Sequence, residues 1–334
     1  MIESVQFRNF RVLRDTTLPL ERFTLIIGPN GSGKSTALKA LRLAARPSEA
    51  SYLDIKSVAS NTEEVQVVIK WGNPYTGRIT TTRWIPRGYE GPYHTHAGGA
   101  RLTDQDQQLL NKVLSEVQVY SFDARALSAA VQLVPNLKLD SFGAGLAGVL
   151  DQLRDRDPDR FEGLRSEFAR CIPEFDQVTF KTVSHGYKEL ALRTREGRHM
   201  IRITDVSQGT LLALAILTLA YIPDPLPIVC LEDPDRGLHP RLLRDVQDAL
   251  YRLSYPEDFG ERRPGVQVLA TTHSPYFLDL FRDHPAQVVI AHKAGQEARF
   301  ERLSTRADLN EILGEAHLGD VWYSGILGGV PSRQ

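Results

Sequence analysis

A glycine-rich segment between an apolar run and a helix-like run limits the fold of this 334-residue chain more than any other feature. Residues 28–36 read Gly-Pro-Asn-Gly-Ser-Gly-Lys-Ser-Thr, with the apolar residues 23–27 before them and a run of helical spacing over 35–43. Glycines let backbone N–H groups turn toward phosphate oxygens, and a helix N-terminus favours negative charge. The pattern therefore predicts a P-loop between a strand and a helix.

The side chains of this segment suit a nucleotide and its metal ion. Lys34 supplies a point charge for the β- and γ-phosphates, and Ser35 offers a hydroxyl to Mg²⁺. The predicted nucleotide-binding residues of the loop are Gly28, Asn30, Gly31, Ser32, Gly33, Lys34, Ser35 and Thr36.

A second segment, Ile-Val-Cys-Leu-Glu-Asp-Pro over 228–234, reads as a buried strand that ends in two acids. A P-loop site uses one carboxylate to hold Mg²⁺ through its water shell and another to polarise the attacking water. We assign the first role to Glu232 and the second to Asp233. The alternative is a strand that ends in a solvated acidic turn.

Two further segments fit the edge of a phosphate site. A strand over 266–272 ends at His273, which could donate a hydrogen bond to the γ-phosphate; the alternative is a structural histidine. Ser207 and Gly209 open a long apolar helix, whose N-terminus would attract an anion; the alternative is a simple N-cap.

Composition excludes several classes of protein. The formal net charge of −1 gives no global attraction to nucleic acid or to an anionic membrane, although a local basic face could still exist, so DNA binding has to be argued separately. Cys171 and Cys230 lack metal-ligand or Cys-x-x-Cys spacing, so we expect reduced, buried thiols in a cytoplasmic protein. No export signal is visible at the N-terminus, and the apolar run 211–222 is too short to cross a bilayer, which makes it a buried core helix.

Periodicity and turn residues predict most of the remaining elements. We expect strands over 4–10, 14–20, 117–122, 175–183, 189–194 and 200–203, a hairpin of 65–71 with 78–85, and helices over 103–116 and, broken at Asp157-Pro158, over 145–171. The Gly/Pro-rich segment 86–99 reads as an exposed loop. His94 and His96 lie in it and could be imagined as metal ligands, but they have no Cys or carboxylate partner nearby.

The order of these motifs resembles the ABC-type ATPase heads of the RecF/SMC/OLD class over nearly the whole chain. Residues 2–11, Ile-Glu-Ser-Val-Gln-Phe-Arg-Asn-Phe-Arg, resemble the opening strand of this class, and 232–240, Glu-Asp-Pro-Asp-Arg-Gly-Leu-His-Pro, resemble its acidic strand end and D-loop. Residues 270–275, Ala-Thr-Thr-His-Ser-Pro, are similar to its switch-histidine segment. Residues 318–329, Leu-Gly-Asp-Val-Trp-Tyr-Ser-Gly-Ile-Leu-Gly-Gly, resemble compact stand-alone members.

The resemblance implies one α/β head over 1–334. Its mixed or parallel core sheet carries the P-loop, and it has an N-terminal antiparallel β region and a small helical subdomain. The expected parts are an N-terminal lobe over 1–122, a helical and β insertion over 123–205, and a C-terminal lobe over 206–334 with the signature, the Walker B strand and the switch histidine.

The resemblance also implies a homodimer that forms on ATP and Mg²⁺, in which Ser207 and Gly209 of one copy clamp the nucleotide held by the P-loop of the other. Three departures from the family pattern matter. Glu232-Asp233 replaces the usual Asp-Glu, which suggests slow ATP hydrolysis. The signature reads Val-Ser-Gln-Gly-Thr over 206–210, and no Q-loop is assigned beyond the candidate Gln118.

Three functions follow from the resemblance. The first is the ATPase component of a bacterial anti-phage defence system, acting as a switch or scaffold for a separate nuclease or toxin. The second is a RecF-like DNA-repair ATPase that binds DNA in its ATP state. The third is the motor of a membrane transporter, which the signature and Leu238-His-Pro240 disfavour.

Overall fold

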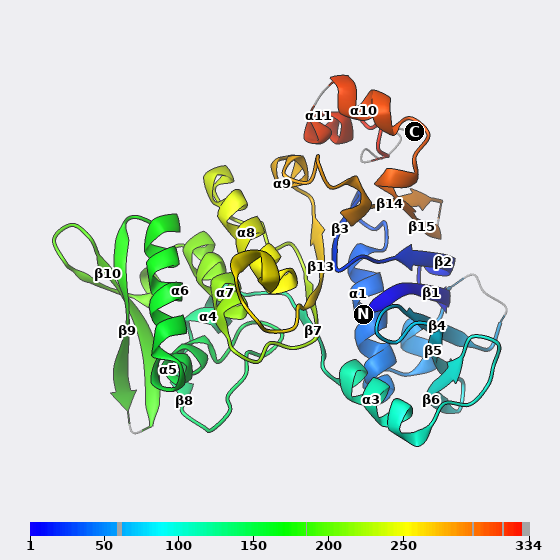
Figure 1. Cartoon of the computed structure of the whole chain (residues 1–334), viewed down its shortest axis with the longest axis horizontal. Helices are drawn as coiled ribbons and strands as arrows, with labels where there is room; N and C mark the ends of the chain where they lie inside the picture. Colours follow the sequence, from blue (N-terminus) through cyan, green and yellow to red (C-terminus); the bar gives the residue numbers. More distant parts are fainter. Residues whose placement is uncertain (59–61, 185, 296, 316, 329–334) are drawn as a thin grey trace. The chain divides into compact units, whose positions relative to one another are not determined.

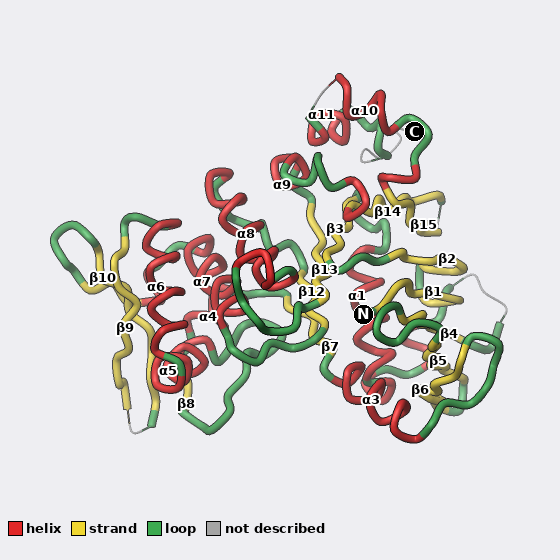
Figure 2. Tube along the Cα trace, viewed as in Figure 1, coloured by secondary structure: helices red, strands yellow, loops and turns green. Residues whose placement is uncertain are grey.

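The computed structural model describes residues 1–58, 62–184, 186–295, 297–315 and 317–328, and it divides the chain into two compact units. Unit 1 contains Met1–Val119, Leu226–Leu231 and Gln267–Gln334, whereas unit 2 contains Tyr120–Pro225 and Glu232–Val266. Figure 1 labels the elements of each unit, and Figure 2 distinguishes helices from strands and loops. Each unit is therefore assembled from segments that are far apart in the sequence.

Unit 1 begins with a five-stranded antiparallel sheet in the order β2-β1-β4-β5-β6. Alternation explains its strands: Val5 and Phe7 of the first strand are buried, whereas Arg8 is exposed. The strands are β1 (Ile2–Phe10), β2 (Leu13–Pro19), β4 (Val65–Trp71), β5 (Arg78–Ile85) and β6 (Gly88–His96). The predicted antiparallel N-terminal region and its hairpin are confirmed.

The prediction of an exposed loop over 86–99 is wrong, because β6 occupies Gly88–His96. This strand pairs antiparallel with β5 from Ile85↔Gly88 to Arg78↔His96, with a register shift between Thr81 and Arg83. Gly91 lies at that irregularity with φ +100°, where a Cβ would come within 2.6 Å of the Thr81 carbonyl oxygen. Glycine is thus required by a local irregularity in the strand, and pairing with β5 overrides the loop-like composition.

The second sheet of unit 1 has six strands in the order β15-β14-β3-β13-β12-β7. Its centre is parallel: β12 pairs with β13, and β3 lies between β13 and β14. The last strand, β15, is antiparallel to β14. The strands are β3 (Phe23–Ile27), β7 (Val117–Tyr120), β12 (Ile228–Leu231), β13 (Gln267–Thr272), β14 (Val288–Ala294) and β15 (Glu297–Arg302). The predicted mixed core sheet is confirmed.

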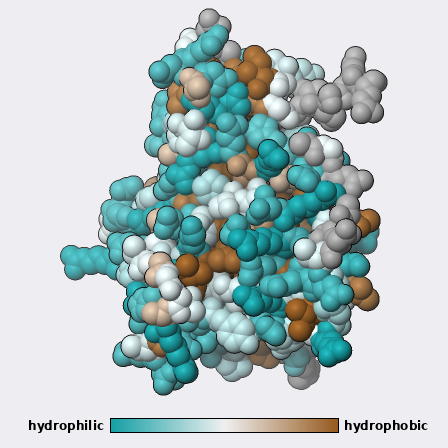
Figure 3. Space-filling model, turned by 90° about the vertical axis from the view of Figure 1, so that its right-hand side faces the viewer, coloured by the Kyte–Doolittle hydropathy of each residue, from teal (hydrophilic) through white to brown (hydrophobic). Residues whose placement is uncertain are grey.

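Helix α1 joins the two sheets of unit 1 through one hydrophobic core. Its buried residues Leu38 and Leu41 belong to the same cluster as Phe7 of β1 and Ile26 of β3. The helices of this unit are α1 (Lys34–Ala45), α2 (Tyr52–Ile55), α3 (Asp104–Ser115), α9 (Pro275–Asp279), α10 (Leu309–Glu315) and α11 (Leu318–Tyr323). The face drawn in Figure 3 is largely hydrophilic, with separate apolar patches.

Unit 2 is built around α7 (Gln208–Tyr221), a 14-residue helix whose residues are buried from Gly209 onward. This confirms the predicted core helix. The other elements are α4 (Ala124–Ser128), α5 (Leu146–Arg156), α6 (Pro158–Cys171), α8 (Leu243–Ser254), β8 (Val131–Gln132), β9 (Phe175–Ser184), β10 (Tyr187–Thr194) and β11 (Met200–Arg202). Among the described residues, no helix combines the length and apolar character needed to span a membrane.

The break between α5 and α6 falls at Asp157-Pro158, as predicted. Asp157 ends α5, and its side chain then accepts a hydrogen bond from the N–H of Arg160 at 3.2 Å. Pro158 occupies the first turn of α6, where a missing N–H costs nothing. One acidic residue therefore separates the two helices and caps the second.

A charged network holds together the ends of several helices in unit 2. The carboxylate of Glu261 accepts from Arg160 at 3.0 Å, Arg252 at 2.6 Å and Arg263 at 2.8 Å. Arg252 also donates to the Tyr221 hydroxyl at 2.9 Å. The Glu261 side chain is only 11 % exposed, so its negative charge depends on these three guanidinium groups.

Candidate nucleotide-binding site

The predicted P-loop lies at the carboxyl end of β3, in unit 1. The loop turns where the N–H of Ser32 donates to the carbonyl of Pro29 at 3.2 Å, and α1 begins at Lys34. Gly33 caps the helix with φ +93°, a left-handed conformation that favours glycine. The predicted strand, loop and helix are thus confirmed, and the loop leads into a helix N-terminus, whose first N–H groups have no partner within the helix.

The loop lies against β14 and β15, which sequence reasoning did not connect with it. A Cβ on Gly28 would come within 2.3 Å of the Ala291 carbonyl oxygen, and a Cβ on Gly33 would lie 2.9 Å from the Cβ of Ala298. Both glycines have positive φ as well. Close packing therefore adds to backbone conformation as a reason for glycine at both ends of the loop.

The polar atoms of the loop fit a phosphate group. Lys34 is only 5 % exposed, and its Nζ donates to the carbonyls of Gly28 at 2.8 Å and Pro29 at 3.1 Å. The Oγ of Ser32 is buried and has no hydrogen-bond partner among the described residues. Asn30 and Ser35 are exposed. A buried cation together with an unpaired hydroxyl suits a ligand rich in hydrogen-bond acceptors.

His273 lies at the same edge of the sheet as the P-loop. Strand β13 runs parallel to β3 with Thr272 opposite Ile27, so residue 273 follows at the carboxyl end. The next residue, Ser274, donates its N–H to the Thr272 hydroxyl at 2.9 Å and caps α9. His273 itself is exposed. The structure thus brings together the P-loop and the predicted histidine within unit 1.

The acidic pair follows the predicted strand, β12, whose Leu231 is opposite Ala270 of β13. Glu232 and Asp233 belong to unit 2 and are half-buried. The N–H of Glu232 donates to the Tyr120 carbonyl at 2.8 Å, and Asp233 has a φ of +45°. The predicted strand is confirmed, and the roles of the two carboxylates stay predictions.

Ser207 and Gly209 lie at the start of α7 in unit 2. The exposed Ser207 accepts a hydrogen bond from the Thr210 N–H at 3.2 Å, and the first turn of the helix contains no acid. A Cβ on Gly209 would come within 2.6 Å of the Gly237 carbonyl oxygen. The structure therefore brings the signature segment against the loop that follows the acidic pair.

Gln118, the candidate for the Q-loop, lies inside β7, where its side-chain nitrogen donates to the Val119 carbonyl at 3.4 Å. The residues just after this strand line an open pocket of about 390 Å³ in unit 2. Its lining comprises Ser121, Phe122, Asp123, Ala126, Asp140, Phe142 and Arg236. Sequence reasoning missed this pocket because Asp140 and Arg236 come from segments with no common pattern.

Of the two histidines considered as metal ligands, His94 has a structural setting, whereas His96 is exposed. His94 is buried between the Thr80 hydroxyl at 2.7 Å and the Asn111 side-chain oxygen at 2.9 Å, and Trp71 donates to the same hydroxyl at 2.7 Å. Burial lowers the pKa of His94, while the hydrogen bond to Asn111 raises it by less. In the parts of the chain that the structure describes, no group of three or more His, Cys, Asp or Glu side chains could hold a metal ion.

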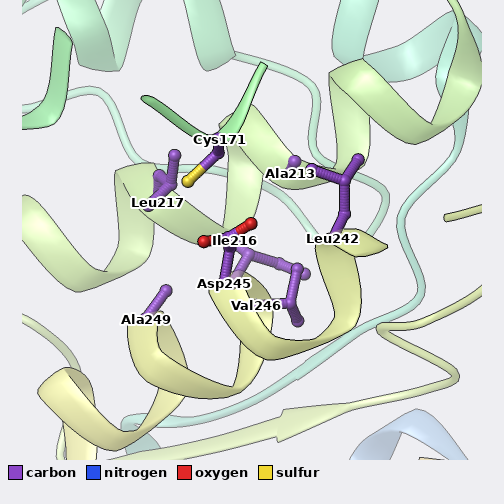
Figure 4. Close-up of a pocket in the computed structure, with 8 residues that line it drawn as sticks. All are labelled: Cys171, Ala213, Ile216, Leu217, Leu242, Asp245, Val246 and Ala249. Atoms are coloured by element: carbon purple, nitrogen blue, oxygen red, sulfur yellow. The ribbon is translucent and has the colours of Figure 1, made fainter. Parts of the chain in front are cut away.

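The two thiols differ in exposure. The prediction of a buried thiol is confirmed for Cys230 in β12 and is wrong for Cys171, which is half-exposed because it lies at the end of α6. The thiol of Cys171 points into a small pocket between α7 and α8, with the Asp245 carboxylate nearby (Figure 4). Burial and the charge of Asp245 raise the pKa of Cys171 to about 12. This thiol is therefore protonated at neutral pH.

Comparisons with known proteins agree with this geometry. Residues 82–279 match the family model described as "AAA domain, putative AbiEii toxin, Type IV TA system", and residues 1–71 match the one described as "AAA ATPase domain". An OLD nuclease of Thermus scotoductus (strain ATCC 700910 / SA-01) is 24% identical over 333 residues. That match covers 86% of this chain and 62% of the relative, so the chain spans less than two thirds of the relative's length.

Solved structures with the same fold are heads of SMC proteins. The Smc head bound to the C-winged helix domain of ScpA superimposes with a TM-score of 0.63 at 17% identity, covering 90% of this chain and 96% of that one. The SMC head domain from Thermotoga maritima gives a TM-score of 0.51 at 14% identity, covering 90% and 98%. At this level of identity the likeness establishes the fold alone.

Proposed function

The chain belongs to the family described as "AAA domain, putative AbiEii toxin, Type IV TA system" and is an ABC-type ATPase of the RecF/SMC/OLD-like class, and from this premise we propose that it is a Mg-ATP-dependent switch. In the proposed cycle, ATP joins two copies of the chain, and hydrolysis separates them. The observation that carries the proposal is the glycine loop with Lys34 at the start of α1, next to the strand that ends before His273.

The nucleotide would be held mainly by unit 1. Backbone N–H groups of the loop and the Lys34 ammonium would bind the phosphates, and the exposed Ser35 hydroxyl would bind Mg²⁺. Mg²⁺ in such sites takes its other ligands from phosphates, water and one or two carboxylates, a role that suits Glu232. Bound Mg²⁺ neutralises charge that develops on the phosphates during transfer.

Hydrolysis would depend on Asp233 and His273. We assign the orientation of the attacking water to Asp233, and a hydrogen bond to the γ-phosphate to His273. The carboxylate of aspartate lies one methylene closer to its backbone than that of glutamate, so we expect slow turnover. Slow hydrolysis suits a switch whose ATP state must persist.

The second copy would contribute the start of its α7. Ser207 is exposed there, and the absence of acids from the first turn leaves the positive end of the helix dipole uncompensated in this segment. A phosphate shared by two subunits would make the interface depend on the nucleotide. The dimer in this proposal is therefore symmetric and holds two nucleotides.

We place the switch in a bacterial anti-phage system in which a separate nuclease or toxin is the effector. The family description names a toxin of a toxin–antitoxin system, and the relative's name describes a nuclease, which supports an effector of this kind. A RecF-like ATPase that binds DNA is the alternative outcome. This alternative predicts that duplex DNA stimulates the ATPase activity. It also predicts that the affinity for DNA falls steeply as the salt concentration rises.

The proposal is tested by nucleotide binding and light scattering on three proteins. The unmodified chain should bind Mg-ATP and hydrolyse it slowly, Lys34→Ala should not bind, and Asp233→Ala should bind, dimerise and not turn over. A monomeric Asp233→Ala protein at saturating ATP would contradict the dimer. Purification of the ATP-bound Asp233→Ala protein from its own cell, followed by mass spectrometry, then separates an effector from DNA-repair proteins.

A further inference from the structure

Lys293 approaches the tip of the P-loop from a strand far away in the sequence. Strand β14 runs parallel to β3 with Ile290 opposite Ile27, so the residues after Ile290 pass beside the loop. A Cβ built on Gly31 would lie 3.5 Å from the Nζ of Lys293. The ammonium group is therefore within reach of a ligand that occupies the loop.

The side chain of Lys293 is exposed and makes no ion pair with any carboxylate in the described part of the chain. Two nearby arginines, Arg14 and Arg306, have carboxylate partners. Arg14 contacts Glu297 at 3.1 Å, and Glu301 accepts from both His292 at 2.9 Å and Arg306 at 3.3 Å. The Lys293 ammonium thus lies at the loop without a carboxylate partner among the described residues, whereas Arg14 and Arg306 each have one.

The second cation of the loop has a different position. Lys34 is buried and donates to the carbonyls of Gly28 and Pro29, at the base of the loop, whereas Lys293 meets Gly31. Ser32 lies between Gly31 and Lys34 in the sequence, and its buried Oγ has no hydrogen-bond partner among the described residues. Helix α1 adds the positive end of its dipole. Two ammonium groups on one anion-binding loop suit a ligand with several negative charges.

We propose that Lys293 is a second phosphate-binding lysine, which contacts the polyphosphate chain of the nucleotide beside Gly31. This inference rests on the proposed ATP site and adds a residue to it that the P-loop motif does not contain. A second cation should increase the affinity for ligands with more than one phosphate. It should also increase the salt dependence of their binding.

The test uses equilibrium binding of ATP and of inorganic tripolyphosphate to the full chain. Lys293→Gln should weaken both ligands by about tenfold at low salt, as expected for the loss of one charge-assisted contact, and should reduce the effect of added salt. Lys293→Arg should restore most of the affinity. Lys70→Gln is the matched control, because Lys70 is also exposed on a strand of unit 1, and it should change neither affinity.

The outcomes separate this inference from the proposed function. If Lys34→Ala abolishes ATP binding while Lys293→Gln binds both ligands like the unmodified chain, the role of Lys293 is wrong and the ATP site stands. A weaker affinity for ATP with an unchanged affinity for tripolyphosphate would also overturn the proposed role of Lys293, because it would indicate that Lys293 contacts the base or the ribose. If the unmodified chain binds neither ligand, the proposed function itself fails. A thermal unfolding midpoint of Lys293→Gln equal to that of the unmodified chain would exclude a folding defect.

Discussion

Gly209 lies so close to Gly237 that a Cβ on the first would come within 2.6 Å of the carbonyl oxygen of the second. Gly209 starts the buried helix α7, and Gly237 follows the acidic pair in the same unit with φ +75°. Real Cβ atoms essentially never approach an oxygen this closely, so the two segments fit together only with glycine at position 209.

Gly209→Ala should therefore destabilise unit 2 by about 1–3 kcal/mol, because the added methyl group must displace the backbone of residue 237. Chemical denaturation measures the change. Gly314→Ala is the control: a Cβ there meets nothing within 4 Å, and alanine favours the helix α10, so stability should hold or rise slightly. Equal stability of Gly209→Ala and the unmodified chain would show that the contact relaxes at no cost.

His273→Ala should slow ATP turnover by about 100-fold, as expected for the loss of one group that acts in the transition state, and should leave ATP affinity within about twofold. Single-turnover hydrolysis and equilibrium binding give the two quantities separately. His284→Ala, in the same unit, is the matched control and should have normal turnover. Unchanged single-turnover hydrolysis in His273→Ala would make His273 a structural residue.

The chain should lose stability as the pH falls below 6.5, in part because of His94. In the unfolded chain this histidine takes up a proton near its ordinary pKa of 6.5, whereas burial lowers its pKa in the folded state. Between the two pKa values the folded state binds fewer protons than the unfolded state. The protein therefore has its full stability above pH 6.5 and loses stability as the pH falls toward the lowered pKa.

Urea denaturation between pH 5 and 8 measures this dependence. His94→Gln removes the titrating ring and should flatten the pH dependence in that window, with some loss of stability at pH 8. His199→Gln, an exposed histidine, should keep the slope of the unmodified chain. An unchanged slope in His94→Gln would assign the titration to another group.

Cys171 should resist alkylation at pH 8, since its pKa of about 12 leaves almost no thiolate. Asp245→Asn should accelerate the reaction with iodoacetamide, because the nearby negative charge that raises the thiol pKa is removed. Mass spectrometry of the modified peptide gives the rate at Cys171 separately from that at Cys230. A Cys171 thiol that reacts at the rate of a free cysteine would contradict the raised pKa.

Glu261→Gln should lower the free energy of unfolding by about 3 kcal/mol, because three arginines lose the charge that they share in a largely buried position. The control is Glu162→Gln. Among the described residues Glu162 pairs only with Arg165, three residues later on α6, and its side chain is 56% exposed, so the loss should stay below about 0.5 kcal/mol. Similar losses in the two variants would mean that the network contributes no more than a surface pair.

Much of the fold could be predicted because local chemistry determines it. The P-loop, the strand before Glu232, the buried helix α7 and the break at Asp157-Pro158 each depend on residues that are neighbours in sequence. The segment over Gly88–His96 was mispredicted because its strand depends on pairing with β5. The pocket after β7 was missed for a similar reason, since its lining comes from several segments.

The sequence by itself determined that this chain places a phosphate-binding loop between a strand and a helix, because glycine, lysine and serine act there through short-range backbone geometry and charge. Only the tertiary structure decided which distant residues surround that loop. The parallel pairing of β14 with β3 brings Lys293 to Gly31 and Ala291 to Gly28, and no local pattern encodes that pairing. The contact of Gly209 with Gly237 likewise depends on packing between segments, which side-chain periodicity does not specify.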